Sequence, residues 1–187
     1  MQLNKLSIVI VLSLLGFTAT AQSEEKVPQA VYDLAETLKD WGNNSVLVTA
    51  VKEQNAKGSS LDEIKSKDEA WMKTVGVDSF MDSLMNNAAA TELKKLESSQ
   101  PYFLEVFLMD QQGANVAMTN KTSDYWQGDE AKFTKSYNGG AGGLDIGKVK
   151  FDKSSQAYLV QVSVPVMDGT TAIGAITIGI NLDELEK

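Results

Sequence analysis

The hydrophobic spacing of this 187-residue chain changes once, at Pro101, and that change constrains the fold more than any other feature. Before Pro101, apolar residues recur at three- and four-residue steps, which is typical of amphipathic helices. After Pro101, aromatic and β-branched runs of strand length alternate with turn residues such as Gly and Asp. Helices followed by strands that are joined largely by hairpins predict an α+β domain with an antiparallel sheet.

Three helical stretches are expected before Pro101. Their ends carry ordinary helix signals: a proline at a first helical position, a Ser-x-x-Glu capping box, an aspartate cap, and a closing glycine or proline. The first stretch is expected to be one long amphipathic helix. The expected ranges are 28–56, 60–76 and 78–100, with Asn86-Asn87 as a candidate interruption of the last.

Five strands are expected after Pro101, over 102–109, 115–119, 148–151, 158–166 and 172–180. The last strand is apolar on both faces, so we expect it at the centre of the sheet. Its glycines, Gly174 and Gly179, indicate close approach by a neighbouring element. The connection over 120–147 is long for a compact domain, and loops of that length are often functional.

The N-terminal residues are typical of a secretory signal peptide. Lys5 supplies the positive charge, Leu6–Phe17 is an apolar run too short for a comfortable membrane span, and Ala19-Thr20-Ala21 provides the small-x-small cleavage pattern. We therefore expect cleavage after Ala21 and one periplasmic domain over 22–187, with an uncleaved anchor as the alternative. No later run reaches spanning length, so no stable membrane insertion is expected after cleavage.

The composition narrows the chemistry, because the chain has no histidine, no cysteine and no arginine. Imidazole- or thiol-based nucleophiles are excluded, and zinc, haem and iron–sulfur sites lose their usual ligands. A net charge of −8 is a poor match for nucleic acid. We expect no metal, no cofactor and no enzymatic activity. The alternative enzyme would be a carboxylate-dependent hydrolase that pairs Asp124 with Asp129 or Glu130.

The long connection carries the densest polar and aromatic cluster of the chain, Thr122–Phe133. Asp124, Tyr125 and Trp126 are candidates to wall a small-molecule site, since the aromatic rings offer an apolar body with a polar tip and the carboxylate accepts from an ammonium or an amide. Lys132 is a candidate partner for a ligand carboxylate. The alternative is that the aromatic residues pin the loop to the core and that Asp124 caps a short helix.

Two further tyrosines are candidate ligand-binding residues. Tyr137 follows the cluster and is placed to return to the same site. Tyr158 opens a strand, where an aromatic residue is more often a cross-strand packing partner.

The order of these pieces resembles the Cache, or extracytoplasmic PAS-like (PDC), family of sensor domains. The resemblance is carried by the long first helix, the strand Phe103–Asp110 closing on Gly113, the segment Thr122–Glu130, the strand Val162–Val166 and the glycine-containing strand Ile173–Ile180. It implies a five-stranded antiparallel PAS-like sheet with a long N-terminal helix packed alongside. It also implies a small-molecule site between the sheet and the segment after the second strand.

The resemblance also implies a function, with two departures. Family members that bind amino acids typically hold the ligand carboxylate with an arginine, which this chain lacks, so we expect an amine or another small polar metabolite. The sequence stops at Lys187 just after the last strand. We therefore expect an exported sensor module that passes its ligand state to a separate membrane receptor, kinase or cyclase. The alternative is an interaction protein that regulates a receptor by docking without a ligand.

Overall fold

The computed structural model describes residues 26–152 and 156–187. The predicted signal peptide over 1–21 and its cleavage site lie outside the described residues. Among the described residues, no helix combines the length and the apolarity needed to cross a membrane.

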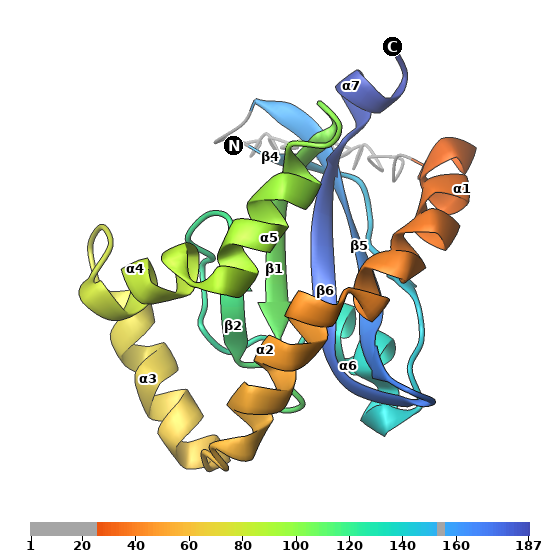
Figure 1. Cartoon of the computed structure of the whole chain (residues 1–187). Coiled ribbons are helices and arrows are strands. Elements are labelled where there is room, and N and C mark those ends of the chain that lie inside the picture. The colour runs from red at the N-terminus through yellow and green to blue at the C-terminus, as the bar shows by residue number, and fades with distance from the viewer. Residues whose placement is uncertain (1–25, 153–155) are drawn as a thin grey trace, which may run out of the picture.

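The front half of the described chain is helical, as the spacing predicted (Figure 1). The Ser60 capping box is present, because the Ser60 hydroxyl accepts from the Glu63 N–H and the Glu63 carboxylate accepts from the Ser60 N–H. Asn87 ends one helix and caps the next, at the interruption that the sequence indicated. The helices are α1 Gln29–Leu38, the short 3₁₀ helix η1 Lys39–Asn43, α2 Ser45–Ala56, α3 Leu61–Lys73, α4 Ser79–Asn86 and α5 Ala88–Glu97.

The expected first helix is divided by η1 into α1 and α2. Gly42 lies against β5, where a Cβ atom would stand only 1.9 Å from the carbonyl oxygen of Pro165. Asn44 then restarts the helix, since its side chain accepts from the N–H groups of Val46 and Leu47. The close approach of the backbone to the sheet explains the break, which hydrophobic spacing alone does not reveal.

The back half forms one antiparallel sheet with the order β2-β1-β6-β5-β3, and β4 also pairs with β5. β3 and β4 are successive short pieces along the same edge, so the sheet has the five positions predicted. β6 lies between β1 and β5 and is buried along most of its length, which confirms the predicted central strand. The strands are β1 Phe103–Met109, β2 Asn115–Met118, β3 Asp145–Ile146, β4 Lys150–Asp152, β5 Ala157–Asp168 and β6 Thr171–Asn181.

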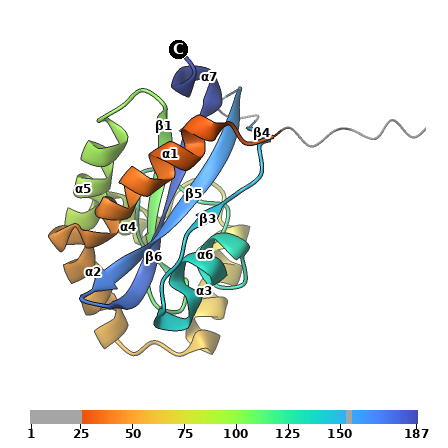
Figure 2. The ribbon, with the colours of Figure 1, turned by 90° about the vertical axis from the view of Figure 1, so that its right-hand side faces the viewer.

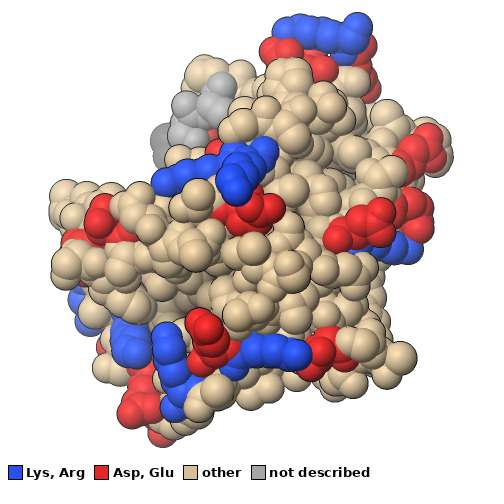
Figure 3. Space-filling model, in the orientation of Figure 1, with Lys and Arg blue, Asp and Glu red and all other residues tan. Residues whose placement is uncertain are grey.

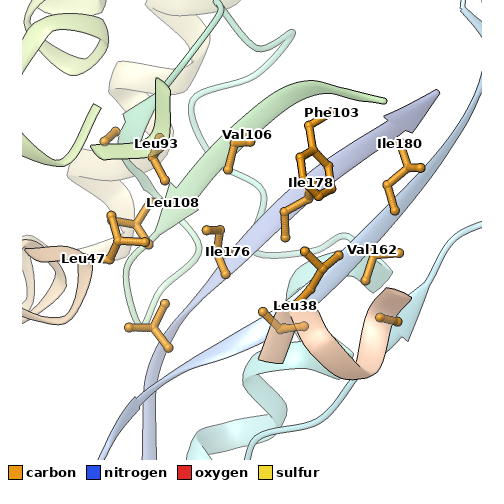
Figure 4. Packing of buried hydrophobic residues seen from close by; sticks show 14 of the residues in the cluster. Leu38, Leu47, Leu93, Phe103, Val106, Leu108, Val162, Ile176, Ile178 and Ile180 are labelled. Atoms are coloured by element: carbon orange, nitrogen blue, oxygen red, sulfur yellow. The ribbon is translucent and has the colours of Figure 1, made fainter. Parts of the chain in front are cut away.

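Helices cover both faces of the sheet (Figure 2). On one face α1, α2 and α5 bury a large apolar core (Figure 4), in which Leu38, Leu47 and Leu93 pack against Val106, Ile178 and other strand residues. On the other face α3, α4 and the later helix α6 (Ala131–Tyr137) enclose a second cluster around Phe107 and Tyr125. The predicted α+β fold, with helices packed on an antiparallel PAS-like sheet, is therefore confirmed.

Candidate functional site

The segment that follows β2 is pinned to the second face of the sheet. The backbone N–H of Asn115 on β2 donates to the carbonyl oxygen of Tyr125 at 3.0 Å, and Ala114 forms an isolated antiparallel bridge with Trp126. The indole N–H of Trp126 donates to the carbonyl oxygen of Gln112 at 2.8 Å. From the other side, the Asp68 carboxylate of α3 accepts from the N–H groups of Tyr125 and Trp126. The segment is therefore held like a short additional edge strand.

A cavity of about 470 Å³ lies between this segment and the sheet, and we name it the sheet cavity. Its walls come from β1, β5, the segment that leads into α6, and the β3–β4 stretch. The charged and amide side chains that line it are Glu105, Asp124, Glu130, Lys132, Lys148, Lys150, Asp152 and Gln161.

The floor of the sheet cavity is a hydrogen bond that crosses the central strand. Glu105 on β1 and Gln161 on β5 both lie opposite Gly179 of β6 in the strand register. The Gln161 amide donates to the Glu105 carboxylate at 2.9 Å. A Cβ atom on Gly179 would stand 2.5 Å from Cγ of Glu105, so only glycine leaves room for this side chain to cross β6. The close approach predicted at Gly179 is therefore present, and it positions a carboxylate in the cavity.

The wall opposite the floor carries a lysine that is held by its neighbours. The Lys132 ammonium lies 3.1 Å from the Glu130 carboxylate, and donates to the amide oxygen of Gln127 at 3.1 Å. It also lies 5.3 Å from the ring centroid of Phe107, a distance at which a cation–π attraction contributes. Gln127 in turn donates to the backbone carbonyl oxygen of Asp124 at 2.8 Å. Lys132 therefore ties α6 to the Asp124 segment.

Two other carboxylates of the lining, Glu105 and Asp124, accept hydrogen bonds from neutral donors. Glu105 accepts from the Gln161 amide, and Asp124 accepts from the Ser123 hydroxyl at 2.6 Å. An ionised carboxylate has acceptor capacity for several donors, and a neutral donor leaves its charge uncompensated. Lys132, by contrast, has Glu130 beside it. Of these charged groups, Glu105 and Asp124 are thus the best placed to attract a cation.

The structure divides the six predicted ligand-binding residues. Asp124 and Lys132 line the sheet cavity together. Tyr125 points away from it, into the second hydrophobic cluster, with its ring centroid 5.7 Å from Trp71 and 5.3 Å from Phe80. The adjacent residues 124 and 125 thus face different spaces, as alternation along an extended segment requires.

The other three aromatic candidates do not line the sheet cavity. Trp126 is half-buried, with the Lys65 ammonium 4.7 Å from its ring centroid. Tyr137 stacks on Phe133 with ring centroids 5.2 Å apart. Tyr158 is 44% exposed and makes an edge-to-face contact across the strands with Phe151. Trp126 and Tyr158 thus make the kinds of packing contact that their alternative interpretations describe, and a ligand-binding role for these three residues stays a prediction.

Sequence reasoning missed the floor of the cavity. Glu105 is an acid inside the apolar run Phe103–Met109, and Gln161 is an amide inside the apolar run of β5. A single polar residue within a strand that is otherwise buried is itself a signal, because burial of a polar group requires a partner. The sequence does not reveal that the strand register places both residues opposite Gly179.

The structure places Asp129 and Glu130, the candidate partners of Asp124 in a hydrolase, in different surroundings. Glu130 lines the sheet cavity and pairs with Lys132, whereas Asp129 is exposed and does not contribute to the wall. Within the described ranges, no group of three acidic side chains lies close enough together to hold a metal ion.

No family model matches the chain, and no curated protein matches it. Solved structures do match. The sensor domain of the Vibrio cholerae histidine kinase DctB is 13% identical with a TM-score of 0.43, over 84% of this chain and 50% of that one. The sensory domain of the Campylobacter jejuni chemoreceptor Tlp3 is 15% identical with a TM-score of 0.43, over 84% of this chain and 64% of that one.

The ligand-binding domain of the Pseudomonas aeruginosa PAO1 amino acid chemoreceptor PctC, in complex with GABA, is 12% identical with a TM-score of 0.38. The match covers 82% of this chain and 63% of that one. This chain therefore spans about half to two thirds of the length of these structures. These neighbours are sensor or ligand-binding domains of a histidine kinase and of chemoreceptors.

Proposed function

We propose that this chain is an exported sensor module that binds a small polar molecule with a cationic group in the sheet cavity. The observation that carries the proposal is the Glu105 carboxylate, which Gln161 holds across Gly179 at the floor of a cavity that Asp124 also lines. A volume of about 470 Å³ falls within the range of small-molecule sites in proteins.

A primary ammonium group suits the two carboxylates. It offers three donors and no acceptor, whereas each carboxylate offers acceptors only. A charge-assisted hydrogen bond of this kind is about twice as strong as a neutral one. The lining holds four carboxylates against three lysines, so a ligand carboxylate would meet more like charges than opposite ones, and one of the lysines, Lys132, already pairs with Glu130. We therefore favour an amine over an α-amino acid or an organic acid at this site.

In this proposal the ligand also supplies the signal. Glu105 belongs to the rigid sheet, whereas Asp124 belongs to the segment that lies over it. A cation shared by both carboxylates favours the arrangement in which that segment stays close to β1, and a ligand shifts such an equilibrium by its difference in affinity for the two states. A separate membrane receptor, kinase or cyclase would then recognise the outer surface of this segment.

Calorimetric titration tests the proposal with primary amines and diamines against carboxylates of the same carbon skeletons. Amines are expected to bind, and a ligand at a hundred times its dissociation constant adds about 2.7 kcal/mol to the unfolding free energy. Asp124→Asn and Glu105→Gln are expected to abolish binding. Asp129→Asn, on the exposed neighbour, is the matched control and is expected to bind as the wild type does. Binding of carboxylates alone, or unchanged amine binding in both variants, would overturn the proposal.

A docking protein that needs no ligand is the second candidate, and one observation favours it. Three apolar side chains stand exposed around the turn between α3 and α4: Val75 is 99% exposed, Met72 55% and Val77 52%. A photo-crosslinking amino acid at position 75, in cells that express the chain, tests this function. Capture of one membrane signalling protein, with no thermal stabilisation by any amine, would replace the sensor proposal by docking alone.

A further inference from the structure

A second cavity, of about 400 Å³, lies on the opposite side of the Asp124–Trp126 segment. It is enclosed by α2, α3, α4, α5 and β2, and Tyr125 contributes to its wall. In the orientation of Figure 1 these helices frame the face that is turned towards the viewer. We name it the helical cavity and define it by Gln54, Lys57, Lys67, Phe80, Leu84 and Tyr125.

The helical cavity has an apolar wall next to polar groups. Phe80 and Leu84 of α4 line it together with Val116 of β2 and the small residues Ala88 and Ala89 at the start of α5. These residues offer a surface for a short hydrocarbon chain rather than for a fully polar molecule. Tyr125 is 1% exposed and adds the edge of an aromatic ring that packs against Phe80.

Two lysines from different helices reach this cavity. Lys57, at the end of α2, donates to the Gln54 amide oxygen at 2.9 Å, so the partner that it contacts is neutral. Lys67 of α3 has its ammonium 5.7 Å from the Phe80 ring centroid, so its positive charge lies beside the apolar wall. Both side chains are exposed, so they are free to adjust to a ligand. Figure 3 shows lysine and acidic side chains side by side along the lower part of this face, over α2 and α3.

Acidic groups near the cavity do not cancel this charge. Glu53 is the acid that lines it. Glu63 and Lys67 attract each other electrostatically, but the Glu63 carboxylate accepts hydrogen bonds from the Ser60 N–H and hydroxyl in the capping box. Asp110 lies behind the wall, in hydrogen-bond contact with Gln54, and its carboxylate accepts from the N–H groups of Gln112 and Ala114. The lining residues themselves carry two lysines and one acid beside an apolar wall. The sheet cavity has the opposite character, because its lining carries four carboxylates against three lysines.

We propose that the helical cavity is a second ligand site, which binds a small organic monocarboxylate with a short hydrocarbon chain. The carboxylate lies between Lys57 and Lys67, and the chain packs on Phe80, Leu84 and Val116. The two sites differ in the charge of their ligands, and Asp124 and Tyr125 are neighbours in sequence that face one site each.

The probes for this site are the straight-chain monocarboxylates from acetate to octanoate, with the alkylamines of equal length as controls. Backbone amide NMR spectra of the labelled protein report both affinity and location. We expect saturable shifts for residues of α3, α4 and the start of α5, with affinity that rises with chain length, since each buried methylene adds about 0.8 kcal/mol, or roughly fourfold. Alkylamines are expected to leave these residues unshifted.

Three variants keep the proposal falsifiable. Lys57→Gln and Lys67→Gln are each expected to weaken octanoate binding by about tenfold, the loss of one charge-assisted contact. Ala88→Phe places a ring in the cavity from an exposed helix position and is expected to abolish binding while the protein stays folded. Lys73→Gln, an exposed lysine of the same helix α3 that does not line the cavity, is expected to bind as the wild type does.

Asp124→Asn separates the two proposals, because it removes a group of the sheet cavity and leaves the helical cavity intact. Octanoate binding that survives in Asp124→Asn supports the second site even where no amine binds. Absence of shifts at millimolar octanoate, shifts that map to the sheet cavity, or wild-type octanoate affinity in both Lys57→Gln and Lys67→Gln would overturn it.

Discussion

Asp68 of α3 holds the backbone of Tyr125, although the two residues are 57 positions apart in sequence. The Asp68 Oδ1 atom accepts from the Tyr125 N–H at 2.8 Å and from the Trp126 N–H at 3.0 Å. Asp68 is 9% exposed, and its hydrogen bond with Tyr125 is buried whereas that with Trp126 is partly buried. One carboxylate thus fixes the segment that separates the sheet cavity from the helical cavity.

Asp68→Ala is expected to lower the free energy of unfolding by about 2 to 4 kcal/mol, because it leaves the buried N–H of Tyr125 and the partly buried N–H of Trp126 without their acceptor. Asp68→Asn keeps an oxygen in place and is expected to cost less than half as much. Urea denaturation measures both. Glu69→Ala, on the exposed side of the same helix, is the control and is expected to change stability by less than about 0.5 kcal/mol. Equal stabilities of Asp68→Ala and Glu69→Ala would show that the carboxylate does not hold the segment.

Gly179→Ala is expected to displace Glu105 and to abolish amine binding, because its Cβ atom would stand 2.5 Å from Cγ of Glu105. We expect a loss of stability of about 1 to 3 kcal/mol, as for other overpacked sites. The double variant Gly179→Ala with Glu105→Ala removes the clash. It is expected to recover most of the stability and none of the amine binding, which thermal unfolding and calorimetry measure separately. Failure of the second change to restore stability would contradict the steric role of Gly179.

The sequence predicted the fold well because its signals are local. The capping box at Ser60, the cap at Asn87, and the apolar spacing of the strands each depend on a few neighbouring residues. The break at Gly42 was missed because its cause is a carbonyl oxygen of Pro165, more than a hundred residues away. Local patterns predict elements, whereas a contact between distant elements requires the folded chain.

The candidate site was less accessible to sequence reasoning for the same reason. The segment with Asp124 was found because polar and aromatic residues cluster in it. Glu105 and Gln161 join it only through the register of three strands, which fixes both opposite Gly179. The direction of Tyr125 depends on the hydrogen bonds that Asp68 makes to the segment. Neither the strand register nor the contact with Asp68 can be inferred from residues that are adjacent in sequence.

The Tyr125 hydroxyl is expected to titrate above the ordinary range of a tyrosine. Burial, together with the nearby charge of Asp110, raises the pKa of Tyr125 to about 12. The unfolded chain has the ordinary pKa near 10, so the folded state binds the proton more tightly, and stability is lost as the pH rises from about 10 through 12. Absorbance at 295 nm should show a late step that Tyr125→Phe removes, whereas Tyr32→Phe, at an exposed position, should leave it. Simultaneous titration of all tyrosines would contradict the burial of this hydroxyl.

Asp110 is expected to make the protein more stable in mild acid than at neutral pH. Burial raises the pKa of Asp110 above its ordinary 3.8, against hydrogen bonds from the N–H groups of Gln112 and Ala114 that lower it. Because the folded state binds this proton more tightly than the unfolded chain does, the stabilising contribution is complete below about pH 3.8 and is lost as the pH rises through the native pKa.

The variant Asp110→Asn isolates this contribution, since the amide oxygen can still accept from the Gln112 and Ala114 N–H groups. The difference in unfolding free energy between wild type and variant, measured by urea denaturation from pH 3 to 8, is expected to shift in favour of the variant as the pH rises. Glu63→Gln serves as the comparison, because hydrogen bonds from Ser60 lower the pKa of Glu63 at an exposed position. For Glu63→Gln, the difference in unfolding free energy should therefore shift in favour of the wild type as the pH rises. The shift should be small, because solvent screens an exposed group. A difference for Asp110→Asn that is flat across this range would show that the native pKa is not raised.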